Sequence, residues 1–143
     1  FNKMKNFKSV LVVTLILDLI QFIPLVLVKM GGDIKNQIIS DFNIKGLASS
    51  APALEVLDIM FYIFGFIYLG TILSVVYTLK LKTVEGLKSA TFVLFIVHLF
   101  WTLPDFVTLL SGGSSHPPII IMILTLIPVI GLYYVSQKGA LKS

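Results

Sequence analysis

Asp18 is the first residue whose type and position point to chemistry, because it is an ionisable side chain in the middle of an apolar run. A charged side chain at that depth in a membrane costs about 2.5–3.5 kcal/mol on insertion scales, so it needs a partner or a function. Thr14 and Gln21 lie four residues before it and three residues after it, on the same face of a helix. This polar face indicates either a carboxylate that binds a ligand or a proton inside a helix bundle, or a neutral, protonated aspartic acid whose hydrogen bond joins two helices.

His98 is the second candidate, because it lies close to the middle of another apolar run. Trp101 and Asp105 follow it at spacings of three and seven residues, again on one helix face. A histidine here can shuttle a proton or orient a carboxylate, whereas the structural alternative is a neutral histidine bonded to a neighbouring helix. Trp101 lies too deep for the aromatic belt of a membrane interface, so we expect it to line a packing contact or a pocket.

Asp58 and Tyr62 are the third candidate, one turn apart near the start of a further apolar run. The helix dipole stabilises acidic residues in a first turn, which accounts for the neighbouring Glu55 and is also the structural explanation for Asp58. At 1.5 Å of rise per residue, Asp58 and Asp105 lie roughly 8–12 Å outside the membrane midplane, with Asp18 and His98 near it.

Acids on three different helices therefore reach similar depths, which predicts an acidic, aromatic pocket in the outer half of a bundle. Such a pocket suits a cationic or lipid-like small molecule. The candidate ligand-binding residues are Asp18, Gln21, Asp58, Tyr62, His98, Trp101 and Asp105. The sequence assigns no catalytic residue, no metal site and no cofactor.

The elements that position these residues are four long apolar runs. Of the 143 residues, 57% are hydrophobic and 13% are charged, and the mean hydropathy is +0.99, whereas soluble domains carry about 25% charged residues. The sequence predicts one all-α integral membrane domain over residues 1–143, a bundle of four transmembrane helices at about 9–28, 53–79, 89–110 and 118–135. In the first outer connector, Ile34, Ile38, Ile39 and Phe42 recur at helical spacing, which predicts a short amphipathic helix on the membrane surface.

The distribution of lysines predicts the orientation, since all eleven basic residues are lysines and they lie between or beside the runs. An excess of lysine marks cytoplasmic segments, so both termini are predicted in the cytoplasm, with a prokaryotic plasma membrane as the expected location. The predicted inner side carries eight lysines and the outer side three: Lys3, Lys5, Lys8, Lys80, Lys82, Lys88, Lys138 and Lys142 inside, and Lys29, Lys35 and Lys45 outside. No basic cluster with interleaved aromatic residues occurs, which argues against nucleic-acid binding.

Missing residue types exclude several classes of membrane protein. The absence of cysteine excludes disulfides, thiolate metal sites and thiol redox chemistry. The absence of arginine argues against enzymes that clamp glutathione with guanidinium groups. No metalloprotease, phosphate-loop or hydrolase motif is present, and an enzyme transferring a proton through His98 is a weaker possibility.

The layout resembles the four-helix EXPERA group, which includes the sigma-2 receptor and emopamil-binding sterol isomerases. The resemblance covers the four spans, the long first outer connector, the inward-facing termini, and Val97-His98 followed by Thr102-Leu103-Pro104. It implies a ligand pocket within the bundle, in which acids such as Asp18 and Asp58 hold an amine or a developing cation. The chain is also similar in layout to the DoxX-like small bacterial membrane proteins.

Three functions follow as expectations. The first is an integral protein of the lipid bilayer that binds a small amphiphilic ligand within the helix bundle. The second is an accessory or structural subunit, whose polar residues satisfy contacts with a partner membrane subunit or with another copy in a homo-oligomer. The third is a proton-coupled small-cation transporter in which Asp18 alternates between a proton and the cation.

Overall fold

The computed structural model describes residues 6–41, 44–113 and 116–140, which form an all-helical structure. Four of its helices are long and apolar enough to cross a membrane, as the sequence predicts: α1 (Phe7–Met30), α3 (Ala51–Thr78), α4 (Val84–Leu110) and α5 (Ile119–Lys138). The shorter α2 (Gly32–Asp41) and the 3₁₀ turn η1 (Leu47–Ser49) form the connector between α1 and α3. The chain is therefore a multi-pass helical membrane protein.

Side-chain caps mark where three of the long helices, α1, α3 and α4, begin. Asn6 accepts a hydrogen bond from the Lys8 amide at 3.0 Å, and Ser50 accepts one from the Ala53 amide at 3.4 Å. Thr83 accepts one from the Gly86 amide at 3.2 Å, so α4 begins five residues before the predicted span. The difference arises because a cap satisfies backbone donors in a polar first turn that hydropathy alone assigns to a loop.

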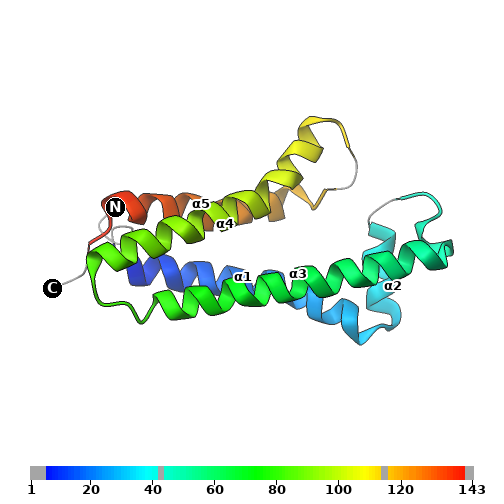
Figure 1. Cartoon of the computed structure of the whole chain (residues 1–143). Coiled ribbons are helices and arrows are strands. Elements are labelled where there is room, and N and C mark those ends of the chain that lie inside the picture. Colours follow the sequence, from blue (N-terminus) through cyan, green and yellow to red (C-terminus); the bar gives the residue numbers. More distant parts are fainter. Residues whose placement is uncertain (1–5, 42–43, 114–115, 141–143) are drawn as a thin grey trace.

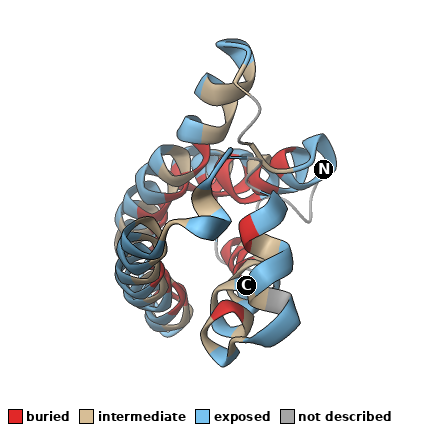
Figure 2. Ribbon diagram, turned by 90° about the vertical axis from the view of Figure 1, so that its right-hand side faces the viewer, coloured by how far each residue is buried: buried red, intermediate tan, exposed pale blue. Residues whose placement is uncertain are grey.

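The long helices form two layers, one of α1 and α3 and the other of α4 and α5 (Figure 1). The most extensive contact is between α4 and α5, and α1 joins the layers by packing on both α3 and α5. Buried residues line the inside of the bundle, and the outward faces are exposed (Figure 2). These exposed faces are apolar, as lipid contact requires.

The two ends of the bundle are packed differently. One hydrophobic cluster fills the end that holds both termini, and its members come from all four long helices: Phe7, Leu11, Val75, Leu87, Leu94, Leu132 and Val135. Toward the other end α4 turns away from the rest of the bundle (Figure 1). Pro104 lies in that part of α4 and has no N–H to donate to the Phe100 carbonyl, which favours the bend. We call the two ends the closed half and the open half, with Asp18 and His98 at the boundary.

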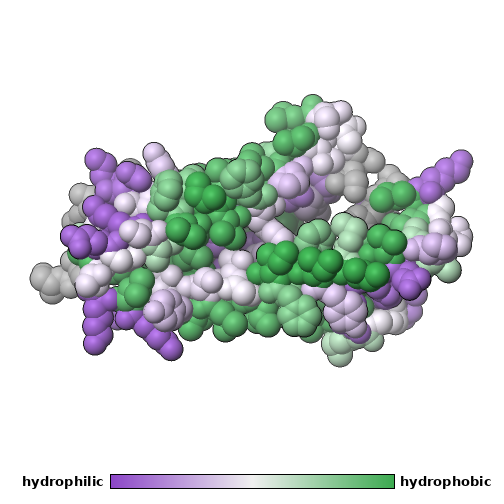
Figure 3. All heavy atoms as spheres, viewed as in Figure 1, coloured by the Kyte–Doolittle hydropathy of each residue, from purple (hydrophilic) through white to green (hydrophobic). Residues whose placement is uncertain are grey.

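The lysines lie at the two ends of the bundle. Lys8, Lys80, Lys82, Lys88 and Lys138 occupy the end with the termini, and Lys29, Lys35 and Lys45 occupy the other (Figure 3). Lys3, Lys5 and Lys142, which also entered the orientation argument, lie outside the described residues. The common end for both termini agrees with four spans, while the assignment of that end to the cytoplasm stays a prediction.

A helix, α2, is present in the predicted connector, while its amphipathic character stays a prediction. Ile39 on this helix is buried and Ile38 is half-buried, whereas Phe42 lies outside the described residues. Its location on the membrane surface stays a prediction.

Candidate functional site

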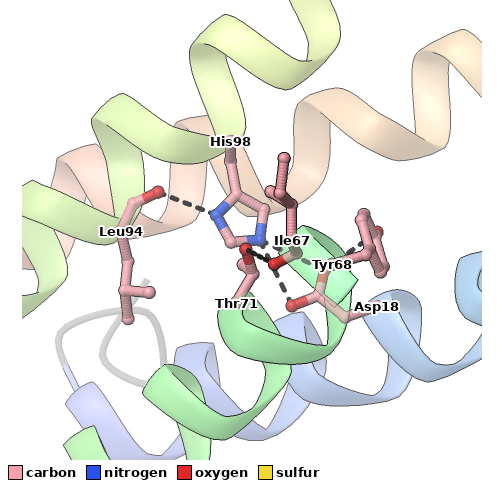
Figure 4. Close-up of polar contacts among 6 residues, drawn as sticks. All are labelled: Asp18, Ile67, Tyr68, Thr71, Leu94 and His98. Atoms are coloured by element: carbon pink, nitrogen blue, oxygen red, sulfur yellow. Dashed lines mark hydrogen bonds and ion pairs between the residues drawn. The ribbon is translucent and has the colours of Figure 1, made fainter. Parts of the chain in front are cut away.

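Asp18 and His98 meet at the centre of the bundle. Asp18 comes from the middle of α1 and has no solvent-exposed surface, and His98 comes from α4 and is 7% exposed. The His98 Nε2 atom lies 3.1 Å from Oδ1 and 3.3 Å from Oδ2 of Asp18 (Figure 4). Two of the predicted candidates, eighty residues apart in the sequence, are therefore direct partners.

The other ring nitrogen of His98 fixes its protonation pattern. Nδ1 lies 2.7 Å from the Leu94 carbonyl oxygen, and because a carbonyl only accepts, Nδ1 carries a proton and donates it. Contact between Nε2 and the Asp18 carboxyl group then requires one further proton between them. This proton lies either on Nε2, giving an imidazolium–carboxylate pair, or on Asp18, giving a neutral pair. In both forms the pair has no net charge.

Tyr68 of α3 is the third polar residue of this site. It is 4% exposed, and its hydroxyl is 3.5 Å from Asp18 Oδ1, a long contact that leaves His98 as the main partner. The neighbouring Thr71 hydroxyl donates to the Ile67 carbonyl at 3.1 Å within α3 (Figure 4). Sequence reasoning missed Tyr68; the available signal was a tyrosine deep within an apolar run, where its hydroxyl needs a partner.

Aromatic rings surround the Tyr68 side of the pair. Trp101, one of the predicted candidates, lies 5.0 Å from the Tyr68 ring, measured between ring centroids. Phe22 stacks on Tyr68 at 6.3 Å, and Phe64 packs edge-on against Trp101 at 5.7 Å. These four rings, which we call the aromatic group, come from α1, α3 and α4 and begin the open half.

Asp58 and Tyr62 belong to a separate group nearer the end of the bundle. Lys35 Nζ forms an ion pair with Asp58 Oδ2 at 2.8 Å. Lys29 Nζ donates to the Asp58 backbone carbonyl at 3.3 Å and lies 2.9 Å from the centroid of the Tyr62 ring. Asp58 and Tyr62 therefore lie together, but Lys35 already pairs with the Asp58 carboxylate and Lys29 already covers the Tyr62 ring.

The remaining candidates lie apart from these two groups. Asp105 is half-buried on α4, and the ionisable group that interacts with it is His116 of the α4–α5 connection. Gln21 is half-buried on α1 and has no hydrogen bond to any residue that the structure describes. An apolar groove of about 210 Å³ runs between α1 and α3 in the open half, with Phe22, Gly65 and Tyr62 in its lining and Lys29 at its end.

The structure thus brings together Asp18, His98 and Trp101 but does not bring all seven candidates into one pocket. Among the described residues, no three histidine or carboxylate side chains gather as metal ligands would. No family model, curated protein or solved structure matches the chain significantly. The likeness to the EXPERA group therefore stays a prediction from the layout and the motif around His98, and the likeness to the DoxX-like proteins stays a prediction from the layout.

Proposed function

We propose that this protein binds a hydrophobic cation, or an amphiphile with a cationic head, beside Asp18 and His98 in exchange for the proton that they share. The observation that carries the proposal is the pair of contacts made by the His98 ring, to Leu94 through Nδ1 and to Asp18 through Nε2. The Leu94 contact holds one proton on Nδ1, so the second proton is the one that a ligand can replace.

The charge of each state explains the exchange. With the shared proton present, the pair is neutral and is stable in an apolar interior. Without it, a carboxylate faces the lone pair of Nε2, and a net negative charge is buried at high cost. A cation beside Asp18 compensates that charge, so cation binding and proton release favour one another.

The aromatic group supplies the rest of a site for such a ligand. The faces of Tyr68, Trp101 and Phe22 attract a cation through their ring quadrupoles, and they pack against its apolar parts. In the open half, the apolar groove between α1 and α3 has Phe22 in its lining and gives a hydrophobic cation a route from the bilayer to the aromatic group. Figure 3 shows a hollow between the two layers of the bundle there.

The membrane setting is part of the same proposal. The described end with both termini carries five lysines and the opposite end three, which favours cytoplasmic termini. The open half then faces the outside of the cell, α2 lies on the outer surface, and the membrane is a prokaryotic plasma membrane.

Binding is tested with tetraphenylphosphonium, a hydrophobic cation that cannot itself gain or lose a proton. Trp101 is the single tryptophan of the chain, so its fluorescence reports on the site directly. We expect saturable quenching, with an affinity that rises up to about tenfold per pH unit while binding releases one proton. Tetraphenylborate, an anion of the same shape, is the control for apolar binding and is expected not to saturate the site.

Asp18→Asn is the decisive variant for this test. Its amide donates to His98 Nε2 and so keeps the helix contact, but no proton is shared and no negative charge can form. We expect it to abolish saturable quenching and its pH dependence, whereas Asp58→Asn, a matched change within the Lys35 ion pair, leaves both unchanged. Equal affinity of Asp18→Asn and the unchanged protein for tetraphenylphosphonium would overturn the proposal.

Proton-coupled transport of the cation is the second candidate function, and the shared proton is the observation that favours it. A transporter must also expose the pair to the side of the closed half, through the cluster around Leu11 and Leu94. In liposomes, a pH gradient then drives tetraphenylphosphonium movement that Asp18→Asn abolishes. Binding without gradient-driven movement would contradict transport and support binding as the sole function.

A further inference from the structure

A second cavity lies at the opposite end of the bundle from the open half. Its volume is about 280 Å³, and it lies between the start of α1, the α3–α4 connection and the start of α4. Phe7, Leu11 and Leu87 form its floor and are 1%, 0% and 3% exposed. The cavity therefore lies on the hydrophobic cluster of the closed half, at the end of the bundle where α1 and α4 begin and α3 ends.

The α3–α4 connection gives the cavity an amphipathic wall. Its sequence alternates Leu79, Lys80, Leu81 and Lys82; the two leucines line the cavity and are half-buried, and the two lysines are exposed. Backbone hydrogen bonds from Leu79 to Val75 and from Leu81 to Thr78, both 3.1 Å, hold this arrangement. Lys8 and Asn6 complete the cavity lining from the side of α1.

The charge around the cavity is strongly positive. This end of the described chain carries Lys8, Lys80, Lys82, Lys88 and Lys138 against a single carboxylate, Glu85. None of these five lysines forms an ion pair within the part of the chain that the structure describes, in contrast to Lys35 at the other end. Unpaired lysines around an apolar cavity favour the binding of an anion that carries an apolar chain.

We propose that this cavity binds an anionic phospholipid of the adjacent leaflet. The glycerol backbone and the first part of an acyl chain occupy the space between Leu79, Leu81 and the Phe7 floor. The phosphate faces Lys8 and the lysines of the connection. A lipid fits this cavity because its negatively charged headgroup is attached directly to hydrocarbon chains. Lipids also surround the protein in the bilayer at high concentration. The inference does not depend on the site at Asp18.

Native mass spectrometry of the detergent-purified protein tests the inference. The probes are phosphatidylglycerol and phosphatidylcholine with identical palmitoyl and oleoyl chains, offered at equal concentration. We expect preferential retention of phosphatidylglycerol by the unchanged protein. Each lysine near an anionic headgroup contributes about fivefold, so Lys8→Gln with Lys82→Gln lowers the preference by roughly 25-fold.

Matched variants distinguish lipid binding in the cavity from nonspecific attraction by surface charge. Lys35→Gln with Lys45→Gln removes the same charge at the opposite end and is expected to leave the preference unchanged. Lys8→Arg with Lys82→Arg keeps the charge and is expected to keep the preference. Leu81→Trp fills the cavity while all lysines remain, and is expected to lower phosphatidylglycerol retention.

Three results would overturn the inference. The first is an equal loss of preference in both double glutamine variants, which would indicate net charge without a site. The second is unchanged retention in Leu81→Trp, and the third is displacement of the lipid by glycerol 3-phosphate; either would show that the phosphate binds without the apolar cavity. Lys8 and Lys82 are exposed, so their replacement leaves the fold intact, as thermal unfolding followed by circular dichroism will verify.

Discussion

The closed half and the open half of this bundle are made of the same apolar helices but differ in how those helices pack. In the closed half, Leu11, Val75, Leu132 and Val135 are each fully buried and come from three different helices. In the open half, α4 turns away from its neighbours, and rings rather than interdigitating aliphatic side chains lie between the layers (Figure 1). Hydropathy therefore determines where a chain lies in a membrane, whereas packing determines which part stabilises the fold and which part can admit a ligand.

The largest expected effect tests whether stability resides in the closed half. Leu11→Ala removes a side chain with no exposed surface, and we expect it to lower the free energy of unfolding by about 2 kcal/mol, the low end of the range for such changes because lipid is as apolar as the core. Leu19→Ala on the same helix is the matched control, since Leu19 is 47% exposed. Unfolding in mixed detergent micelles, followed by circular dichroism, measures both, and equal losses would contradict the division into two halves.

The boundary between the halves gives the next effect. His98→Leu leaves the buried Asp18 carboxyl with only the long Tyr68 contact, and Asp18→Leu leaves Nε2 of His98 unpaired. Each change is expected to cost about 1 kcal/mol, the low end of the range for such groups, because a buried polar group without a partner bears its desolvation penalty. The double variant removes both groups and is expected to be more stable than the sum of the single losses predicts. Strict additivity in this cycle, measured by the same unfolding assay, would show that the pair does not interact.

The sequence predicts the spans well but the site only in part, and the reason is physical. Four apolar runs of sufficient length must be helices in lipid, so their existence and approximate bounds follow directly. The meeting of Asp18 and His98 depends on the rotation of α1 and α4 about their axes. Apolar residues surround both helices on all sides, so no stripe marks the inward face. Polar residues are then the best available markers of the inward face, and here both Asp18 and His98 lie on it.

Asp58 and Asp105 show what cannot be predicted from the rise per residue along a helix. Depth places Asp58 and Asp105 at similar heights, but depth says nothing about neighbours. Lys29 and Lys35 reach Asp58 and Tyr62 on long flexible stems, and Lys35 comes from α2, whose position against α3 no periodicity reveals. The depth of Tyr68 within an apolar run indicates that its hydroxyl needs a partner, but only the placement of three helices together identifies that partner as Asp18.

The smallest expected effect comes from the ion pair of Lys35 and Asp58 and completes the comparison with the buried pair. The side chains of Lys35 and Asp58 are 26% and 37% exposed, so water and salt screen their attraction. A double-mutant cycle with Lys35→Gln and Asp58→Asn is therefore expected to give a coupling energy below about 0.5 kcal/mol that shrinks further in high salt. The Asp18–His98 cycle is expected to give the larger coupling energy and no salt dependence, because hydrated salt ions, unlike a hydrophobic cation, do not enter the bundle centre. Two pairs of similar distance, 2.8 Å and 3.1 Å, would then differ in coupling energy in the direction that their burial predicts. Equal coupling energies in the two cycles would mean that water reaches Asp18, and the exchange of a buried proton for a cation would lose its physical basis.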